Sequence, residues 1–264
     1  QSDPNQLAYI VYTSGTGGTP RAVGHAHRAI WARRMMIRDW YDLRPQDRLL
    51  HAGAFNWTFT LGTGIMDPLS VGATAVIPAA DTDLAGLPEI LARTEASIFA
   101  AVPGVYRKIL KSETLPKLPA LRHGLAAGEK LSTDIRTQWQ TRVGTAIFEA
   151  FGMSECSTFI SSAPHRPAEP KNLGTPQIGR RIVILGEDGP VPIGTEGIIA
   201  IHRNDPGLMI GYINAPEETR ARYAGDWFLT GDRGIMQENG QITYCGRNDD
   251  MMNAGGYRVS PLEV

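Results

Sequence analysis

The sequence contains very little cysteine and no long apolar run. Cys156 and Cys245 are the only cysteines among 264 residues, and no CxxC pair occurs. Neither a disulfide framework nor a zinc cluster is therefore supported, and a reducing cytoplasm is the expected location. No run of about 18 apolar residues is present, so we expect no membrane span. The first five residues, QSDPN, lack the basic and apolar parts of a signal peptide.

The chain also lacks an excess of charge of either sign. It carries 26 Lys and Arg against 27 Asp and Glu, which gives a net charge of −1. Proteins that bind nucleic acids generally carry a basic surplus, so no nucleic-acid partner is expected. Hydrophobic residues make up 42% of the chain, which is enough for a folded core in one large or two modest domains. The histidines have no metal-ligand spacing and are interpreted as structural.

Strand-like and helix-like segments alternate up to Cys156. Such alternation predicts an α/β fold with a mainly parallel sheet flanked by helices, in which ligands bind at the carboxyl ends of the strands. We expect the first strand, and the loop that follows it, to belong to this sheet. The expected strands are 7–12, 48–51, 73–77, 96–101, 124–127 and 145–150, and the expected helices are 25–40, 61–69, 86–93, 105–110 and 133–141, the last with Ser132 as its N-cap.

The pattern changes after residue 170. Apolar runs at 181–185 and 197–201 are followed by two short runs on either side of Asn239-Gly240. An Asn-Gly pair between such runs is typical of a β-hairpin. We therefore expect an α/β subdomain at 1–170, with a phosphate loop and an adenine site, and a small antiparallel, barrel-like β subdomain at 171–247.

The most informative segment is YTSGTGGTPR, residues 12–21. Glycines allow backbone N–H groups to approach an anion, hydroxyls add donors, and Arg21 adds charge-assisted bonds. The spacing is neither that of a Walker P-loop nor that of a GxGxxG fingerprint. On composition alone, the segment could equally be a phosphate-binding loop or an ordinary flexible loop.

Three further segments carry chemistry. Within 149–155, Phe151 could stack on a base and Glu155 could ligate Mg²⁺, although a core Phe and a surface Glu are the simpler interpretation. Asp232, in a Thr-Gly-Asp tripeptide, could accept two ribose hydroxyls or could be a plain turn aspartate. The glycines around 246–256 are typical of a hinge or a ligand loop.

Taken together and in order, the motifs YTSGTGGTPR, AAGE, FGMSE, TGD and GRNDD…GGYRVSPLEV resemble those of the adenylate-forming superfamily. That superfamily includes acyl-CoA synthetases, aryl-CoA ligases, luciferases and peptide-synthetase adenylation domains. The sequence at 99–107 is most similar to that of benzoate-type and short-to-medium-chain acyl-CoA ligases. The resemblance extends from about Tyr9 to Val264. It implies activation of a carboxylic acid by ATP to an acyl-AMP, followed by transfer to coenzyme A.

The resemblance also assigns roles to residues. It implies that residues 13–21 cradle the β- and γ-phosphates, that Gly128 and Glu129 flank the adenine opposite Phe151, and that Ser154 contacts the α-phosphate. Glu155 would hold Mg²⁺, and Asp232 with Arg247 would hold the ribose. The implied catalytic residues are Thr16, Arg21, Ser154 and Glu155, and the implied nucleotide-binding residues are Thr13, Ser14, Gly15, Thr16, Gly17, Gly18, Thr19, Gly128, Glu129, Glu149, Ala150, Phe151, Gly152, Met153, Ser154, Asp232 and Arg247.

The sequence departs from the family pattern in two motifs. The usual Tyr-Gly-x-Thr-Glu is Phe-Gly-Met-Ser-Glu at 151–155, which keeps the stacking face and the hydroxyl. The usual Pro-Lys-Gly that ends the phosphate loop is Pro20-Arg21-Ala22, which keeps the positive charge but changes its geometry. Asp249 matches the family hinge and Gly255 with Gly256 match the border of the coenzyme A tunnel. Residues 248–264 are therefore expected to be the hinge and the start of a C-terminal lid, so the chain resembles the central part of such an enzyme.

The acyl pocket is the least specific part of the interpretation. Phe55, Asn56, Trp57, Val102 and Gly104 follow strand ends, although Phe55 and Trp57 could equally be core. An apolar pocket with an aromatic wall suits an aromatic, alicyclic or short-to-medium aliphatic acid. Two alternatives stay open: an adenylating enzyme that loads a carrier protein, and a nucleotide-binding module without turnover. A homodimer is left open as an assembly.

Overall fold

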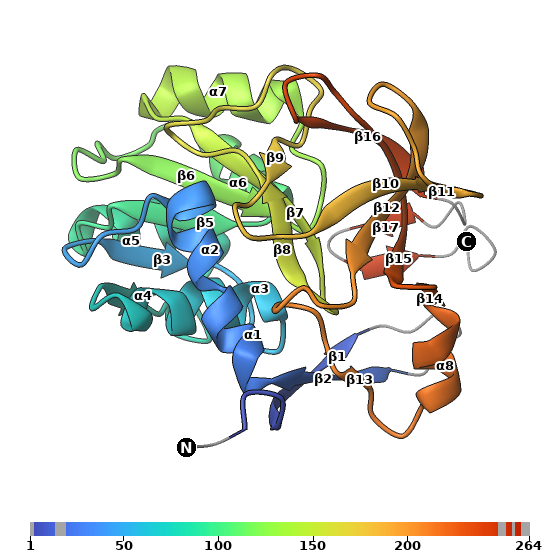
Figure 1. The fold of residues 1–264 in the computed structure, drawn as a ribbon. Coiled ribbons are helices and arrows are strands. Elements are labelled where there is room, and N and C mark those ends of the chain that lie inside the picture. Colours follow the sequence, from blue (N-terminus) through green and yellow to red (C-terminus); the bar gives the residue numbers. More distant parts are fainter. Residues whose placement is uncertain (1–2, 14–19, 248–251, 255–256, 260–264) are drawn as a thin grey trace.

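The computed structural model describes residues 3–13, 20–247, 252–254 and 257–259, and it arranges their strands in four sheets (Figure 1). Helices surround the largest sheet, and an antiparallel sheet stands beside it. In chain order the elements are β1 (Leu7–Thr13), β2 (Arg21–Ala26), α1 (His27–Ala32), α2 (Arg34–Met36), η1 (Ile37–Tyr41), β3 (Arg48–His51), α3 (Thr58–Leu61), η2 (Gly62–Met66), α4 (Asp67–Ser70), β4 (Thr74–Val76), η3 (Leu84–Gly86), α5 (Leu87–Arg93), β5 (Ile98–Ala101), α6 (Pro103–Leu110), β6 (His123–Ala127), α7 (Thr133–Val143), β7 (Ile147–Met153), β8 (Ser157–Ser161), β9 (Thr175–Pro176), β10 (Ile182–Gly186), β11 (Gly189–Pro190), β12 (Glu196–His202), β13 (Gly211–Tyr212), α8 (Pro216–Ala221), β14 (Tyr223–Ala224), β15 (Trp227–Met236), β16 (Ile242–Arg247), β17 (Met252–Ala254) and β18 (Tyr257–Val259).

The largest sheet has seven strands in the order β4-β3-β5-β6-β7-β8-β9. Every pairing from β4 to β7 is parallel, and β8 and β9 are added antiparallel at the β7 edge. Parallel neighbours need crossover connections, which the intervening helices supply. The predicted mainly parallel sheet is confirmed, and Ser132 caps α7 as expected by accepting a hydrogen bond from the backbone N–H of Ile135.

Apolar side chains cover both faces of this sheet. On one face Leu50, Phe99 and other strand residues pack against α5, α6 and α7. On the other face Leu49, Ala100 and Leu125 pack against Met36, Trp40 and Tyr41 of the α2–η1 segment. Successive residues of one strand thus enter different cores, because side chains alternate across a strand. Burial on both faces explains why these strands read as continuous apolar runs.

The second large sheet is antiparallel, in the order β11-β10-β12-β15-β14, with β16 also paired to β15. The β15–β16 hairpin turns at Asn239-Gly240, where Gly240 has φ of 76°, so the predicted hairpin is present. Its core contains Ile182, Ile199, Ile201 and Phe228. The α/β and antiparallel parts are therefore both as predicted. The division at residue 170 stays a prediction, and β9 of the first sheet lies beyond it.

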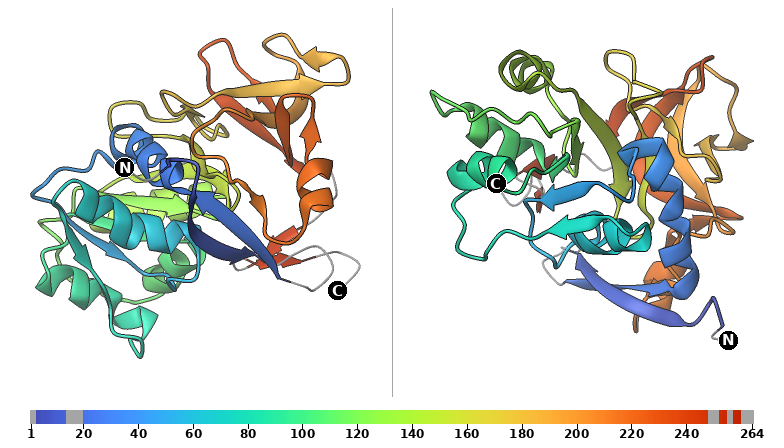
Figure 2. Two further views of the ribbon diagram at one scale, coloured as in Figure 1. Left: turned by 60° about the horizontal axis from the view of Figure 1, so that its bottom comes forward. Right: turned by 90° about the vertical axis from the view of Figure 1, so that its left-hand side faces the viewer.

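The first strand does not belong to the parallel sheet, so the expectation that it does was wrong. Strand β1 pairs antiparallel with β2, and β2 pairs with β13 in a separate three-stranded sheet (Figure 2). Ile10 and Tyr12 are 41% and 65% exposed, whereas Val11 is buried. The apolar run 7–12 was interpreted as a strand buried on both faces, but only one face is covered. The helix expected from His25 begins at His27, because residues 21–26 complete the hairpin.

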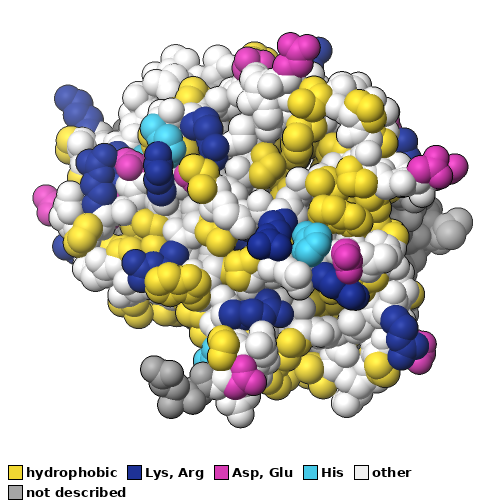
Figure 3. Space-filling view, in the orientation of Figure 1, with side chains coloured by type: hydrophobic (Ala, Val, Ile, Leu, Met, Phe, Trp, Pro, Cys, Tyr) yellow, Lys and Arg dark blue, Asp and Glu magenta, His cyan; other side chains and the backbone are white. Residues whose placement is uncertain are grey.

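The surface view shows hydrophobic side chains in small groups among charged and uncharged ones (Figure 3). Within the described ranges, no helix has the length and apolar character needed to cross a bilayer.

Candidate functional site

A cavity of about 600 Å³ opens between the largest sheet, the antiparallel sheet and the β1–β2 hairpin. Its wall contains residues that follow β6 and residues at the end of β7, which is where parallel sheets bind ligands. The β1–β2 hairpin contributes Thr13, and the antiparallel sheet contributes Asp232 and Arg247. The residues predicted for the site that line this cavity are Thr13, Asn56, Trp57, Gly128, Glu129, Glu149, Ala150, Phe151, Gly152, Met153, Ser154, Glu155, Asp232 and Arg247.

Four described residues predicted for the site do not line the cavity: Arg21, Phe55, Val102 and Gly104. The Arg21 guanidinium forms an ion pair with Glu218 and lies 5.3 Å from the centre of the Tyr212 ring. Val102 stands behind Gly128, where its Cγ1 would lie 3.6 Å from a β-carbon placed on that glycine. Ser14, Gly15, Thr16, Gly17, Gly18 and Thr19 of the expected phosphate loop, together with Asp249, Gly255 and Gly256, lie outside the described residues.

Phe151 forms an aromatic wall of the cavity. It lies on β7, which continues through Met153 and therefore holds this motif in a strand. The Phe151 ring contacts Phe159 edge-on, with centres 5.5 Å apart, and Tyr244 at 5.7 Å. These neighbours fix the orientation of the ring. A ring fixed in this way at a cavity wall can stack on a planar ligand.

Gly152 is required by close packing between β7 and β8. A β-carbon at this position would lie 2.2 Å from the carbonyl oxygen of Ser157, inside van der Waals contact with backbone. The pairing of β7 and β8 shifts register between Phe151 and Gly152, as in a β-bulge. Bulges redirect side chains and occur next to functional sites. The glycine thus allows the chain after Phe151 to turn along the cavity.

Asp232 and Arg247 face each other across β15 and β16. They are direct partners in the strand register, and the Arg247 Nη1 lies 3.5 Å from the Asp232 Oδ1. The hydroxyl of Tyr244 donates to the same oxygen at 3.0 Å. Asp232 is 6% exposed, so these donors stabilise a carboxylate that is largely removed from water. Thr230-Gly231-Asp232 lies within β15 and not in a turn, which excludes the plain turn aspartate.

Glu149 holds the loop that carries Gly128 and Glu129. Its Oε1 accepts the Leu131 backbone N–H at 2.9 Å, and its Oε2 accepts from Arg136 at 3.2 Å. Burial raises the pKa of Glu149 even though these donors oppose the shift. Gly128 has φ of 91°, a conformation that favours glycine. The loop thus presents its backbone to the cavity, while the buried Oε1 of Glu129 has no hydrogen-bond partner within the described part of the chain.

Ser154 and Glu155 form the turn between β7 and β8. The His25 Nε2 donates to the Ser154 carbonyl oxygen at 2.8 Å, and the Met209 N–H donates to the Glu155 carbonyl oxygen at 2.7 Å. Burial lowers the pKa of His25 to about 4, so the ring is neutral at pH 7. The Tyr212 hydroxyl donates to the Glu155 Oε1 at 2.6 Å. Burial and the neighbouring Glu155 raise the pKa of Tyr212, so its hydroxyl remains a donor.

A Mg²⁺ ion bound with a phosphate ligand commonly uses one or two protein carboxylates. Glu155 is 5% exposed and lines the cavity, and the hydrogen bond from Tyr212 occupies only one of its two oxygens. In the described ranges, no group of three or more His, Cys, Asp or Glu side chains is arranged to hold a metal by itself. The residues therefore fit an ion that is shared with phosphate and do not form an all-protein metal site.

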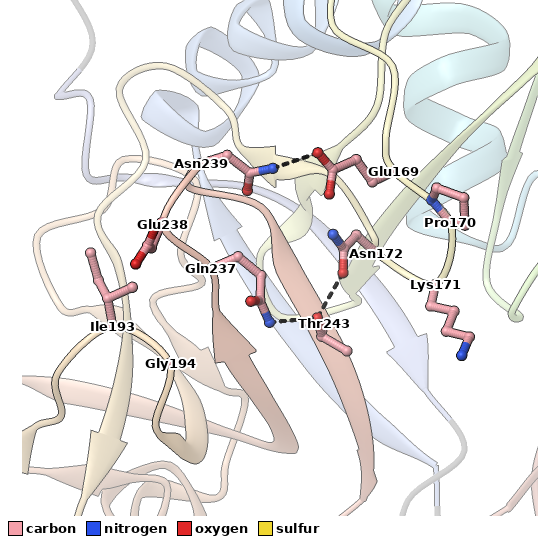
Figure 4. A pocket seen from close by; sticks show the side chains of 10 residues that line it. All are labelled: Glu169, Pro170, Lys171, Asn172, Ile193, Gly194, Gln237, Glu238, Asn239 and Thr243. Atoms are coloured by element: carbon pink, nitrogen blue, oxygen red, sulfur yellow. Dashed lines mark hydrogen bonds between the residues drawn. The ribbon is translucent and has the colours of Figure 1, made fainter.

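A second hollow, of about 670 Å³, lies between the loop 169–172 and the β15–β16 turn (Figure 4). Its polar side chains bond to one another: Asn239 donates to Glu169 at 2.9 Å, and Thr243 donates to Asn172 at 2.7 Å (Figure 4). None of the residues predicted for the site lines it. We therefore take the cavity beside Phe151 as the candidate site.

Three residues that shape the site lie outside the sequence motifs. Tyr212 and Tyr244 contact Glu155 and Asp232 respectively, and His25 holds the Ser154 carbonyl oxygen. Tyr244 and Arg247 are three positions apart, so simple alternation would put them on opposite faces of β16. The register shift opposite Arg233 and Gly234 brings both to the Asp232 carboxylate, and the sequence does not show this irregularity. Tyr212 reaches Glu155 through the pairing of β13 with β2, for which the sequence carries no local signal.

Comparison with known proteins identifies the family. Residues 1–213 match the model of the AMP-binding enzyme family. The chain is 32% identical to a benzoate–CoA ligase of Thauera aromatica, over 99% of this chain and 50% of that protein. It is similar to ATP-bound MatB of Rhodopseudomonas palustris (TM-score 0.85, 27% identity, 99% of this chain and 52% of that one). It is equally similar to the anthranilate CoA ligase AuaEII in complex with anthranoyl-AMP (TM-score 0.85, 28% identity, 100% of this chain and 51% of that one).

The chain spans about half the length of these relatives. The matched segment includes the motifs at 12–21, 126–129 and 151–155, and all three contribute residues to the cavity. The chain belongs to the AMP-binding enzyme family.

Proposed function

We propose that this chain is the nucleotide-binding part of an AMP-forming acid–thiol ligase. Such an enzyme activates a carboxylic acid with ATP to an acyl-AMP and then transfers the acyl group to coenzyme A. The observation that carries the proposal is one cavity lined by Phe151, Glu155 and Asp232 together. These are the residue types needed for a base, a metal-bound phosphate and a ribose. The relatives named above include an ATP complex and an acyl-AMP complex, which supports the same conclusion.

In this proposal the residues bind and orient the reactants. Phe151 stacks on the adenine, the loop at Gly128 covers its other side, and Asp232 accepts the ribose hydroxyls. Ser154 donates to the α-phosphate, and Glu155 holds Mg²⁺, which neutralises charge on the phosphates when bound. Nucleotidyl transfer depends mainly on positioning and charge neutralisation, so no covalent residue is needed. The phosphate loop 13–21 and the catalytic roles of Thr16 and Arg21 remain predictions.

The acid is proposed to be aromatic, alicyclic or short-to-medium aliphatic. Asn56 and Trp57 line the cavity and can border the acyl group. The relatives that act on benzoate and anthranilate support an aromatic acid. Transfer to coenzyme A past Gly255 and Gly256, movement at Asp249, a cytoplasmic location and a homodimer all remain predictions.

Binding of an acyl-adenylate analogue tests the proposal. Benzoyl sulfamoyl adenosine, a stable mimic of benzoyl-AMP, is titrated into the 264-residue chain by calorimetry beside AMP and beside GMP. We expect the analogue to bind more tightly than AMP, and GMP to bind more weakly than AMP. Analogues with acetyl, hexanoyl and cyclohexanoyl groups then rank the acids. The proposal would be refuted if neither AMP nor any acyl-adenylate analogue bound, or if AMP and the benzoyl analogue bound with equal affinity.

A turnover assay separates the remaining alternatives. Exchange of labelled pyrophosphate into ATP that depends on an added acid indicates an adenylating enzyme, whereas nucleotide binding without exchange indicates a binding module. Addition of coenzyme A or of a carrier protein to the same reaction identifies the acceptor. Acyl-CoA as the product would support the ligase reaction directly.

A further inference from the structure

The hydrogen bond between Tyr212 and Glu155 connects two separate sheets at the candidate site. Tyr212 lies on β13 of the three-stranded sheet, whereas Glu155 lies at the end of the largest sheet. The two residues are 57 positions apart, and the phenol oxygen lies 2.6 Å from the Glu155 Oε1. Both side chains are about 5% exposed. A short bond between buried groups, one of them a carboxylate, is among the stronger hydrogen bonds in proteins.

The backbone around Glu155 is fixed independently of this bond. The Met209 N–H holds the Glu155 carbonyl oxygen at 2.7 Å, and the His25 ring holds the preceding carbonyl oxygen at 2.8 Å. Because these two bonds hold the backbone at residues 154–155, the Tyr212 hydroxyl is left to determine how the Glu155 carboxylate is rotated. It engages Oε1 alone, so the direction of Oε2 follows from it.

Tyr212 is itself held in place. Its backbone pairs with Val23 of β2, and its N–H donates to the Thr219 Oγ1 at 2.9 Å. The Arg21 guanidinium lies 5.3 Å from its ring centre and pairs with Glu218 of α8. A ring fixed by a strand, a helix and a cation holds its hydroxyl at one place, which is what orientation of a ligating carboxylate requires.

We propose that Tyr212 is the positioning residue of Glu155, and that its hydroxyl holds Oε1 so that the other carboxylate oxygen is presented to the metal ion of a bound metal–ATP complex. This inference rests on the function proposed above and adds to it a residue outside the recognised motifs. The same inference assigns Arg21 to holding the Tyr212 ring, since its guanidinium pairs with Glu218 and lies over that ring.

Metal-dependent ATP binding tests the inference without turnover. ATP is titrated by calorimetry into the 264-residue chain with saturating Mg²⁺ and again with EDTA, and the ratio of the two affinities is the metal gain. Outer partners of metal ligands typically contribute about 10- to 100-fold in metal affinity. We therefore expect Tyr212→Phe to reduce the metal gain by about tenfold or more while AMP binding without metal is unchanged. Glu155→Gln is expected to abolish the gain.

Tyr223→Phe is the matched control. Tyr223 is also a tyrosine below a cation, with the Arg203 guanidinium 5.5 Å from its ring centre, but it is only partly buried, packs on Phe228 and does not line the cavity. This variant should keep the full metal gain. Thermal melting of all variants verifies that they are folded.

The outcomes separate the inference from the proposed function. A full metal gain in Tyr212→Phe beside a lost gain in Glu155→Gln would overturn the role of Tyr212 and leave the function standing. A parent chain without ATP binding, or an unchanged gain in Glu155→Gln, would overturn the metal role of Glu155 and the inference with it.

A second measurement keeps the inference testable if Tyr212→Phe does not fold. The eight tyrosines are replaced by 3-fluorotyrosine, and fluorine NMR spectra are recorded with AMP and with Mg-ATP. We expect one resonance that moves on the Glu155→Gln substitution and again on addition of Mg-ATP, but not with AMP. If no resonance responds to both changes, Tyr212 does not follow the state of Glu155 and the inference is wrong.

Discussion

Asp232 carries a prediction that depends on a single carboxylate. Its Oδ1 receives the Tyr244 hydroxyl at 3.0 Å and faces Arg247 at 3.5 Å, at the wall of the cavity. Hydrogen bonds to charged groups contribute roughly 1.5–3 kcal/mol each. Asp232→Ala should therefore weaken AMP binding by about 10- to 150-fold in calorimetry.

Asp226 provides the control for this substitution. It is exposed, lies beside β15 and pairs with Arg203 at 3.5 Å. Asp226→Ala should leave AMP affinity unchanged. Equal affinities for AMP in the parent and in Asp232→Ala would show that this carboxylate does not contact the ribose.

Phe151 tests the adenine side of the site. Phe151→Leu keeps an apolar side chain against Phe159 but removes the flat ring that lines the cavity. Stacking of a base on an aromatic ring contributes about 1–3 kcal/mol. We expect AMP affinity to fall by roughly 5- to 150-fold, while affinity for pyrophosphate, which has no base, is unchanged. A proportionate loss for both ligands would instead indicate a general distortion of the cavity.

The residue types of the site could be predicted from sequence, but their partners could not. Phe151, Glu155 and Asp232 lie in short motifs and line one cavity. Tyr212 and Tyr244 contact two of these residues through strand pairings between distant segments. A motif contains the groups that contact a ligand, whereas the groups that orient them come from tertiary structure and leave no spacing in the sequence.

At the scale of the elements, Gly152 determines the close approach of β7 and β8. A β-carbon there would meet the backbone of Ser157 at 2.2 Å and the Cα of Thr158 at 2.5 Å. Backbone cannot move aside as a flexible side chain can, so Gly152→Ala must separate the strands. Overpacking of this kind typically costs about 1–3 kcal/mol. Urea unfolding should show that loss, and the Phe151 wall should shift enough to weaken AMP binding.

Gly86→Ala is the matched control, because a β-carbon at Gly86 meets nothing within 4 Å. It should be neutral or slightly stabilising, since alanine has less conformational freedom in the unfolded chain. If Gly152→Ala is as stable as Gly86→Ala, the close packing of these two strands is not needed for folding.

Helices and strands could be predicted where the hydrophobic pattern was clear and the element was buried uniformly along its length. Strands β3, β5 and β6 are buried along nearly their whole length, and the alternating helices between them indicated the parallel sheet correctly. Strand β1 has an equally apolar sequence but an exposed face, so its sheet was wrongly assigned. Composition shows how apolar a strand is, but not whether a second layer covers it.

At the scale of the whole molecule, buried histidines predict acid sensitivity. Burial lowers the pKa of His51 to about 3 and that of His123 to about 4, below the unfolded value of about 6.5. The unfolded chain therefore binds more protons than the folded chain below pH 6.5, and stability is lost as the pH falls from 6.5 toward 4. Each histidine contributes a slope of up to about 1.4 kcal/mol per pH unit. His123→Gln should reduce the slope measured by urea unfolding, and an unchanged slope would contradict the burial argument.

An ion pair beside the antiparallel sheet is entirely removed from solvent. Arg180, which precedes β10, lies 2.8 Å from the Asp205 Oδ1, and both side chains are 0% exposed. The Arg180 Nη2 also donates to the Thr158 carbonyl oxygen of β8 at 3.0 Å, so the guanidinium connects the antiparallel sheet to the largest one. Gly207 leaves the space, because a β-carbon there would lie 1.8 Å from the Arg180 Nη1.

Removal of one partner of this pair should destabilise the whole fold. Asp205→Ala leaves the guanidinium buried without its counter-charge, a change that typically costs about 3–5 kcal/mol. Joint replacement with Arg180→Met and Asp205→Leu should cost much less, because no charge remains to be buried. The exposed pair Arg203–Asp226 is the control, and Arg203→Ala should cost under about 1 kcal/mol. Urea unfolding of the four proteins measures these differences. An Asp205→Ala chain as stable as Arg203→Ala would mean that the contact between the sheets depends on apolar packing around Phe159 and Ile160 and not on this pair.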